Sequence, residues 1–205
     1  GSYNCDVMTE GLREIVPRCA VDGICSNRWS GHGVCYCDAC RRSFREATGF
    51  ELPVEPVTRE PVWRAYAAWR EERLFAIAAH WDSAIRSVRP QARYIPNSGG
   101  GALSDLDMKA LADSVPLLFA DKQARNGISA PWASGKNAKE FRAVFGRKPI
   151  GGIFSMGVEQ PYRWKDSVQN SAEIRVFVAD GVANGLRPWF TKFCGMVYDP
   201  RWLKP

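Results

Sequence analysis

Short apolar runs alternate along the chain with longer stretches in which apolar residues recur every three or four positions. Apolar runs of about four to eight residues bounded by Gly, Pro, Asn or Asp are typical of buried parallel strands, whereas the wider spacing is typical of helices with one apolar face. The sequence predicts strands at 21–26, 92–97, 115–120, 149–155 and 186–191. It predicts helices at 9–16, 38–48, 61–88, 104–113, 137–145 and 171–183.

The helix predicted at 61–88 has the clearest pattern. Its apolar residues lie mostly three or four apart, Pro61 suits a first helical turn, and Pro90 lies just beyond the end. For the helix predicted at 104–113, Ser104 is the expected N-cap, because a serine hydroxyl can accept a hydrogen bond from a free amide of the first turn.

Strict alternation of strand and helix predicts an α/β fold, a parallel sheet with helices outside it. No G-x-G-x-x-G motif follows the first strand, and polar or aromatic residues follow nearly every strand. Such residues surround the active-site mouth of a (β/α)8 TIM barrel, which has eight strands and about 250 residues. We therefore expect residues 1–205 to form a single, incomplete barrel domain containing about the last five β/α units. The missing N-terminal strands would come from the rest of the protein, a partner chain or self-association.

The charge and hydropathy of the chain narrow the classes of partner. The 28 Lys and Arg residues outnumber the 22 Asp and Glu residues, but they form no basic block, so no nucleic-acid partner is expected. No apolar run approaches the roughly 18 to 20 residues of a spanning helix. We expect no membrane partner and favour a soluble, cytoplasmic protein.

Three of the seven cysteines, Cys35, Cys37 and Cys40, form a C-x-C-x-x-C motif. Three sulfurs on one short loop at the start of a helix can share a tetrahedral zinc ion, so a structural zinc site is predicted. Free or partly oxidised thiols and a catalytic thiol remain alternatives. Spacing does not fix the fourth ligand: Cys5 is the first candidate, and His32, a water or another chain are others. Two further thiols, Cys19 and Cys25, are expected to be ordinary buried cysteines.

These motifs resemble a known family. The stretches that carry the resemblance are 21–27, 35–44, 151–155, 161–166 and 185–189. They are most similar to the barrel glycoside hydrolases called hypothetical glycosyl hydrolase 6, and less closely to the zinc-carrying family 42 β-galactosidases. In the latter, a cysteine after the third strand joins the C-x-C-x-x-C motif to bind zinc, and Cys5 occupies the corresponding position.

The resemblance implies a glycoside hydrolase that cleaves O-glycosidic bonds of a carbohydrate substrate. In the β-galactosidase relatives the fourth strand ends in Asn-Glu, and this Glu is the general acid/base. Here Arg28 follows Asn27, so that acid is absent. The nucleophile of such barrels is a Glu beyond the seventh strand, where Glu159 lies. Because glycoside cleavage commonly needs two carboxyl groups, Asp121, which follows the neighbouring strand, is the second catalytic candidate.

Residues that follow the predicted strands are candidates for substrate binding. Aromatic side chains can stack on pyranose rings or simply pack in the core. Basic side chains would favour an anionic sugar or else pair with the carboxylates, and a galactoside-type sugar is also considered. The candidates are Asn27, Arg28, Trp29, Asn97, Lys122, Arg125, Tyr162, Arg163, Trp164, Trp189 and Lys192. The replacement at Arg28 and the incomplete barrel also suit a non-catalytic carbohydrate-binding or assembly module with a structural zinc loop.

Overall fold

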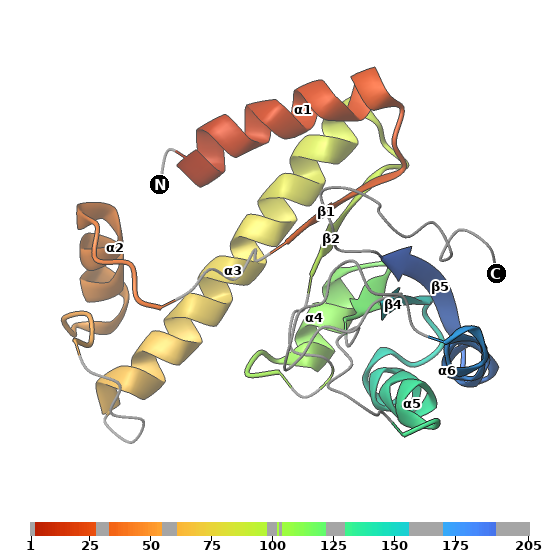
Figure 1. Cartoon of the computed structure of the whole chain (residues 1–205). Coiled ribbons are helices and arrows are strands. Elements are labelled where there is room, and N and C mark those ends of the chain that lie inside the picture. Colours follow the sequence, from red (N-terminus) through yellow and green to blue (C-terminus); the bar gives the residue numbers. More distant parts are fainter. Residues whose placement is uncertain are drawn as a thin grey trace. The chain divides into compact units, whose positions relative to one another are not determined.

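In the computed structural model of the chain, helices and parallel strands alternate, as Figure 1 shows. The structure describes residues 3–27, 33–54, 61–97, 102, 104–121, 130–155 and 170–191. The chain divides into two compact units, Gly1–Pro96 and Asn97–Pro205. The single domain over 1–205 stays a prediction.

The first unit contains a two-stranded parallel sheet. A short π-helix, η1 (Tyr3–Val7), runs into α1 (Met8–Cys19) and is followed by β1 (Gly23–Ser26). After α2 (Asp38–Thr48) and α3 (Pro61–Val88), the chain forms β2 (Arg93–Pro96). β1 and β2 are parallel, with partners running from Gly23 and Arg93 to Ser26 and Pro96.

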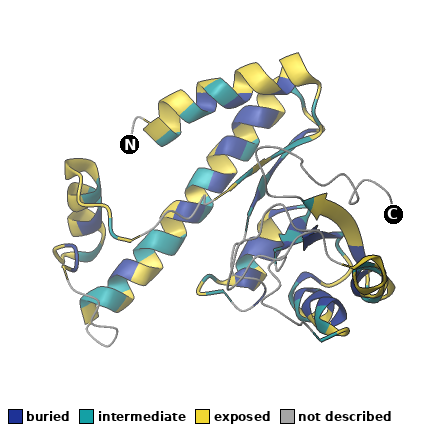
Figure 2. Cartoon of the chain, viewed as in Figure 1, coloured by how far each residue is buried: buried dark blue, intermediate teal, exposed yellow. Residues whose placement is uncertain are grey.

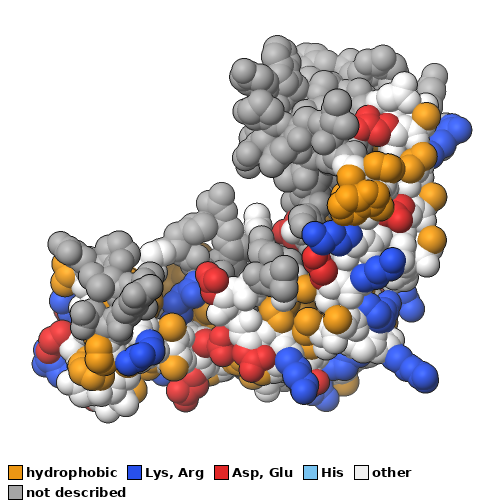
Figure 3. Space-filling view, turned by 90° about the horizontal axis from the view of Figure 1, so that it is seen from below, with side chains coloured by type: hydrophobic (Ala, Val, Ile, Leu, Met, Phe, Trp, Pro, Cys, Tyr) orange, Lys and Arg blue, Asp and Glu red, His pale blue; other side chains and the backbone are white. Residues whose placement is uncertain are grey.

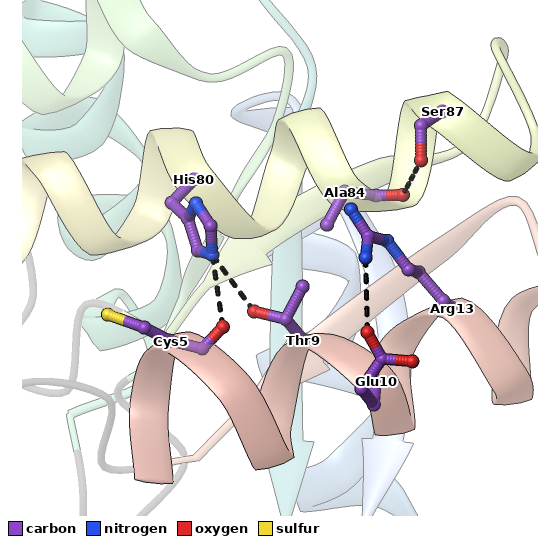
Figure 4. Close-up of polar contacts among 7 residues, drawn as sticks. All are labelled: Cys5, Thr9, Glu10, Arg13, His80, Ala84 and Ser87. Atoms are coloured by element: carbon purple, nitrogen blue, oxygen red, sulfur yellow. Dashed lines mark hydrogen bonds and ion pairs between the residues drawn. The ribbon is translucent and has the colours of Figure 1, made fainter. Parts of the chain in front are cut away.

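α1 and β2 pack against the last third of α3. Trp81 is buried, its ring lies 5.3 Å from that of Tyr94 on β2, and its indole N–H donates to the Asn4 carbonyl at 2.9 Å. His80 Nε2 lies 2.9 Å from Thr9 Oγ1 on α1, as Figure 4 shows. These contacts join α3 to the N-terminal helices η1 and α1 and, separately, to β2.

The first third of α3 packs on α2 instead. Phe44, Leu52 and Tyr66 form a small buried core, against which partly buried side chains such as Cys40 and Trp69 pack. The ring of Phe44 meets those of Tyr66 and Trp69 edge-on, with centroids 6.0 and 5.3 Å apart. The motif that carries the three thiols therefore rests on its own aromatic core.

The second unit contains a three-stranded parallel sheet in the order β3-β4-β5. Its elements are α4 (Met108–Ser114), β3 (Leu118–Ala120), α5 (Ala133–Phe145), β4 (Ile150–Ser155), α6 (Ser171–Ala183) and β5 (Leu186–Thr191). β4 is buried along its whole length, whereas most of β5 is exposed, as the yellow strand in Figure 2 shows.

Close packing of α5 and α6 depends on glycine. A Cβ on Gly181 of α6 would collide with Ser134 Oγ and lie 2.8 Å from Phe154 Cζ. The Asp180 carboxylate accepts a hydrogen bond from the amide of Gly135 in the first turn of α5.

A lysine satisfies the carbonyl groups at the end of α4. Lys148, just before β4, donates to the Ala112 and Val115 carbonyls there, at 2.6 and 3.1 Å.

The predicted elements agree with the structure in type and order. The strands are shorter than predicted at some ends, and they are parallel within each sheet. Ser104 as an N-cap is wrong: α4 begins later, and Asp107 caps it by accepting from the amides of Lys109 and Ala110 at 3.0 and 2.9 Å. The structure thus has the mixed α/β architecture that the sequence predicts, with barrel closure as a further expectation.

The charge distribution and the helices relate to the expectations about nucleic-acid and membrane partners. Basic and acidic side chains lie among one another on the face seen in Figure 3. Among the described residues, no helix combines the length and hydropathy that crossing a membrane requires. The absence of a nucleic-acid partner stays a prediction.

Candidate functional site

The three thiols of the C-x-C-x-x-C motif come together at the start of α2. The sulfur atoms of Cys35, Cys37 and Cys40 all lie within 4.8 Å of one another. Cys37 is the residue before α2 and Cys40 lies in its first turn. Cys35 and Cys37 are exposed, and Cys40 is partly buried. This separation suits three thiolates that share one metal ion.

Backbone and aromatic contacts fix this loop. The Arg41 amide donates to the Cys37 carbonyl at 2.9 Å, and Arg41 Nε donates to the Tyr36 carbonyl at 2.7 Å. The guanidinium of Arg41 also lies over the Tyr36 ring, 5.3 Å from its centroid. The Tyr36 hydroxyl donates to the Pro53 carbonyl at 2.5 Å, which ties the thiol loop to the segment after α2.

Cys37 and Cys40 differ in how readily they lose a proton. Hydrogen bonds from the Cys40 amide and thiol, and from the Cys35 thiol, lower the pKa of Cys37 to about 7. Burial, and then donation of the Cys40 proton to the neighbouring sulfurs, raises the pKa of Cys40 to about 12. Cys37 therefore gives up its proton at a lower pH than Cys40 does. A metal ion would replace the shared protons, because thiolates are its ligands.

The structure does not bring Cys5 to the other three thiols. Cys5 lies on η1, and its carbonyl is 3.4 Å from His80 Nε2 on α3, whereas Cys40 packs beside Tyr66 on the same helix. Fourteen helical residues separate Tyr66 from His80, which is about 21 Å along a helix axis. Cys5 as the fourth ligand stays a prediction, and the alternative His32 lies outside the described residues.

The expectation that Cys19 and Cys25 are buried is wrong. Both are exposed. Cys19 ends α1 at the surface. Cys25 alternates with Ile24, the partner of Tyr94, and α3 packs on the face of the sheet that carries Tyr94. Cys25 is therefore on the opposite face, which explains its exposure.

Two predicted site residues, Asp121 and Trp189, belong to the sheet of the second unit. Asp121 directly follows β3, and its amide donates to the Phe119 carbonyl at 2.9 Å. In the strand register Ala120 pairs with Gly152, and Ile153 pairs with Trp189. Continued by one residue, this register would bring Asp121, just after the end of β3, level with Ile153 and Trp189, which lie within β4 and β5.

The Trp189 side chain packs against a second aromatic ring of the same sheet. The rings of Phe119 and Trp189 meet edge-on with centroids 4.8 Å apart, although β4 lies between their strands. This is possible because Gly151 of β4 has no side chain: a Cβ there would collide with the Phe119 ring. Neither Phe119 nor Gly151 was predicted as a site residue, because their contact becomes apparent only from the register.

The other predicted site residues divide into two groups. Asn27 and Asn97 follow Ser26 and Pro96, which are register partners at the carboxyl ends of β1 and β2. The remaining candidates lie outside the described residues: Arg28, Trp29, Lys122, Arg125, Glu159, Tyr162, Arg163, Trp164 and Lys192. Their roles stay predictions.

Known structures resemble this fold. The chain matches a β-galactosidase from Bacillus circulans sp. alkalophilus with a TM-score of 0.68 and 14% identity, covering 91% of this chain and 32% of that one. A second match is bee venom hyaluronidase in complex with a hyaluronic acid tetramer, with a TM-score of 0.49, 12% identity and coverage of 87% and 65%. Both are glycoside hydrolases.

At these identities the likeness shows the fold alone, and the chain spans about a third of the β-galactosidase chain. No family model matches the sequence, and no curated protein matches it. The finer assignments to hypothetical glycosyl hydrolase 6 or to family 42 therefore stay resemblances.

Proposed function

We propose that this protein is a glycoside hydrolase that cleaves O-glycosidic bonds of a carbohydrate. The observation that carries the proposal is the fold shared with a β-galactosidase over 91% of the chain. Fold alone does not fix chemistry, so the proposal also depends on side chains at the carboxyl ends of the strands, where β/α barrels place their active sites.

The proposed chemistry uses two carboxyl groups. Glu159, beyond β4, is the proposed nucleophile or base, and Asp121, after β3, is the proposed proton donor or second carboxylate. One group must protonate the leaving oxygen while the other attacks the sugar or activates water. Trp189, on β5 of the same sheet, would contact the sugar ring.

We further propose that Cys35, Cys37 and Cys40 hold a zinc ion with a structural role. Zinc suits a set of thiolate ligands, and the proximity of the three sulfur atoms supports it. The ion would tie the loop before α2 to the first turn of that helix. It takes no part in the proposed cleavage.

Hydrolysis of aryl glycosides and aryl uronides tests the proposed activity. Glu159→Gln should abolish turnover and Asp121→Asn should reduce it strongly, because each change removes an ionisable group while keeping the shape of the side chain. Asp113→Asn, an exposed residue on α4, is the matched control and should retain full turnover. Full activity of Glu159→Gln would refute its role.

One observation favours a different function. Arg28 occupies the position that carries the acid/base Glu in the β-galactosidase relatives, and Arg cannot donate a proton at neutral pH. A non-catalytic carbohydrate-binding or assembly module would explain this replacement. Sugar binding without turnover, lost on Trp189→Ala, would favour that alternative.

A further inference from the structure

One face of the sheet in the second unit presents aromatic and basic groups together. Phe119 and Trp189 share this face, as their ring contact requires. Arg187 lies two residues before Trp189 on β5 and pairs with Gly151, over which the Phe119 ring lies. Because side chains alternate along a strand, Arg187 is on the same face as Trp189.

The indole of Trp189 is both fixed and accessible. Phe119 supports it from one side, and 45% of the residue is exposed. A flat, rigid, half-exposed ring costs little conformational entropy on binding and offers a surface for the C–H face of a pyranose. The open position at Gly151 is what lets Phe119 reach Trp189.

Arg187 adds a positive charge to this surface. It is exposed, and in the described part of the chain no carboxylate forms an ion pair with it. Residues two apart on a strand are about 6.6 Å apart, which a guanidinium on its long stem can span. A sugar ring on Trp189 could thus present a carboxylate to Arg187, whose planar fork matches that group.

We propose that the face formed by Phe119, Gly151, Arg187 and Trp189 selects an acidic sugar. The ring of a hexuronoside stacks on Trp189, and its carboxylate pairs with Arg187. The inference rests on the proposed glycoside-directed function and names the class of substrate.

Calorimetric binding of matched sugar pairs tests the inference on the full chain. The probes are 4-nitrophenyl β-D-glucuronide with 4-nitrophenyl β-D-glucoside, and the corresponding galacturonide with the galactoside. Each pair differs only at C6. At least one uronide should bind about tenfold or more tightly than its neutral match, and this preference should shrink when salt rises from about 0.05 to about 0.5 M.

Three variants separate the roles of the residues. Arg187→Met keeps the stem and should bring the two affinities of a pair within about twofold. Arg175→Met, an exposed arginine on α6, should change nothing. Trp189→Ala should lose both sugars of a pair, and Trp189→Phe should recover part of the binding. Thermal unfolding of each variant shows whether the fold is intact.

The outcomes distinguish this inference from the proposed activity. Equal affinities within every pair, or an unchanged preference in Arg187→Met, overturn the acidic-sugar surface even if neutral glycosides are cleaved. Selective uronide binding that depends on Arg187, without turnover, supports the surface and refutes the hydrolase. Failure to bind any of the four probes overturns the inference, and failure to cleave any glycoside as well refutes the proposed function.

Discussion

Metal binding by the three thiols should depend steeply on pH. Each thiol must lose its proton to become a ligand, so protons compete with the metal. Cys37, with a pKa of about 7, is mostly thiolate at pH 8 and mostly thiol at pH 6. Cys40, with a pKa of about 12, carries its proton throughout this range and must release it at every pH.

These two pKa values set the size of the effect. A pKa of about 7 means that the thiolate fraction of Cys37 falls about tenfold between pH 8 and pH 6. The proton on Cys40 costs a further tenfold per pH unit, or about a hundredfold over the same range. These two thiols alone should lower the apparent zinc affinity at least about a thousandfold, since Cys35 must also become a thiolate. The sign is fixed: affinity is lost as the pH falls.

Competition with a chelator of known pH dependence measures the affinity, and the thiolate-to-metal absorption of bound Co(II) reports the ligands. Cys37→Ser should lose both the ion and the absorption. Cys19→Ser, an exposed thiol at the end of α1, is the matched control and should bind normally. A change of less than about thirtyfold from pH 8 to pH 6, or equal damage from both variants, would refute the reasoning.

Three further predictions concern stability and are measured as free energies of unfolding in urea. Gly181→Ala should destabilise by about 1–3 kcal/mol because its methyl group collides with Ser134, while Gly11→Ala, with open space around it, should stabilise by about 0.5–1 kcal/mol. The reverse order would contradict the packing of α5 on α6. Lys148→Met should cost about 1–2 kcal/mol, since it removes the donors to the carbonyls that end α4; an unchanged midpoint would exclude this cap. Trp81→Phe should cost about 1 kcal/mol through its lost bond to η1, and a neutral result would show that water replaces it.

The sequence predicted best those helices in which the helical spacing of apolar residues continues over many residues and residues typical of helix ends mark both bounds. The helices at Asp38–Thr48, Pro61–Val88 and Ser171–Ala183 have the predicted bounds. α5 begins four residues before the predicted start, at Ala133. Its first turn, with Ser134 and Gly135, lacks an apolar period because small residues are needed there for the close approach of α6. Tertiary packing decides that boundary.

In the candidate site too, local sequence features were predictable and features that depend on tertiary structure were not. Proximity of Cys35, Cys37 and Cys40 is a local property of six residues, so spacing alone predicted it. The relation between Asp121 and Trp189 follows from strand order once the register is known. Arg187 could not be recognised beforehand, because an arginine in a strand becomes informative only when the face it shares with Trp189 is identified.

The continuous length of α3 has a consequence for hydrogen exchange. One helix of 28 residues is held near its start by the aromatic core under the thiol loop and near its end by α1 and β2. Its amides should therefore open in two stages, since local unfolding follows the contacts that each segment makes. Removal of the proposed zinc ion should speed exchange in the turns around Tyr66 and leave the turns around Trp81 protected, so that a single helix reports separately on the stability of two regions.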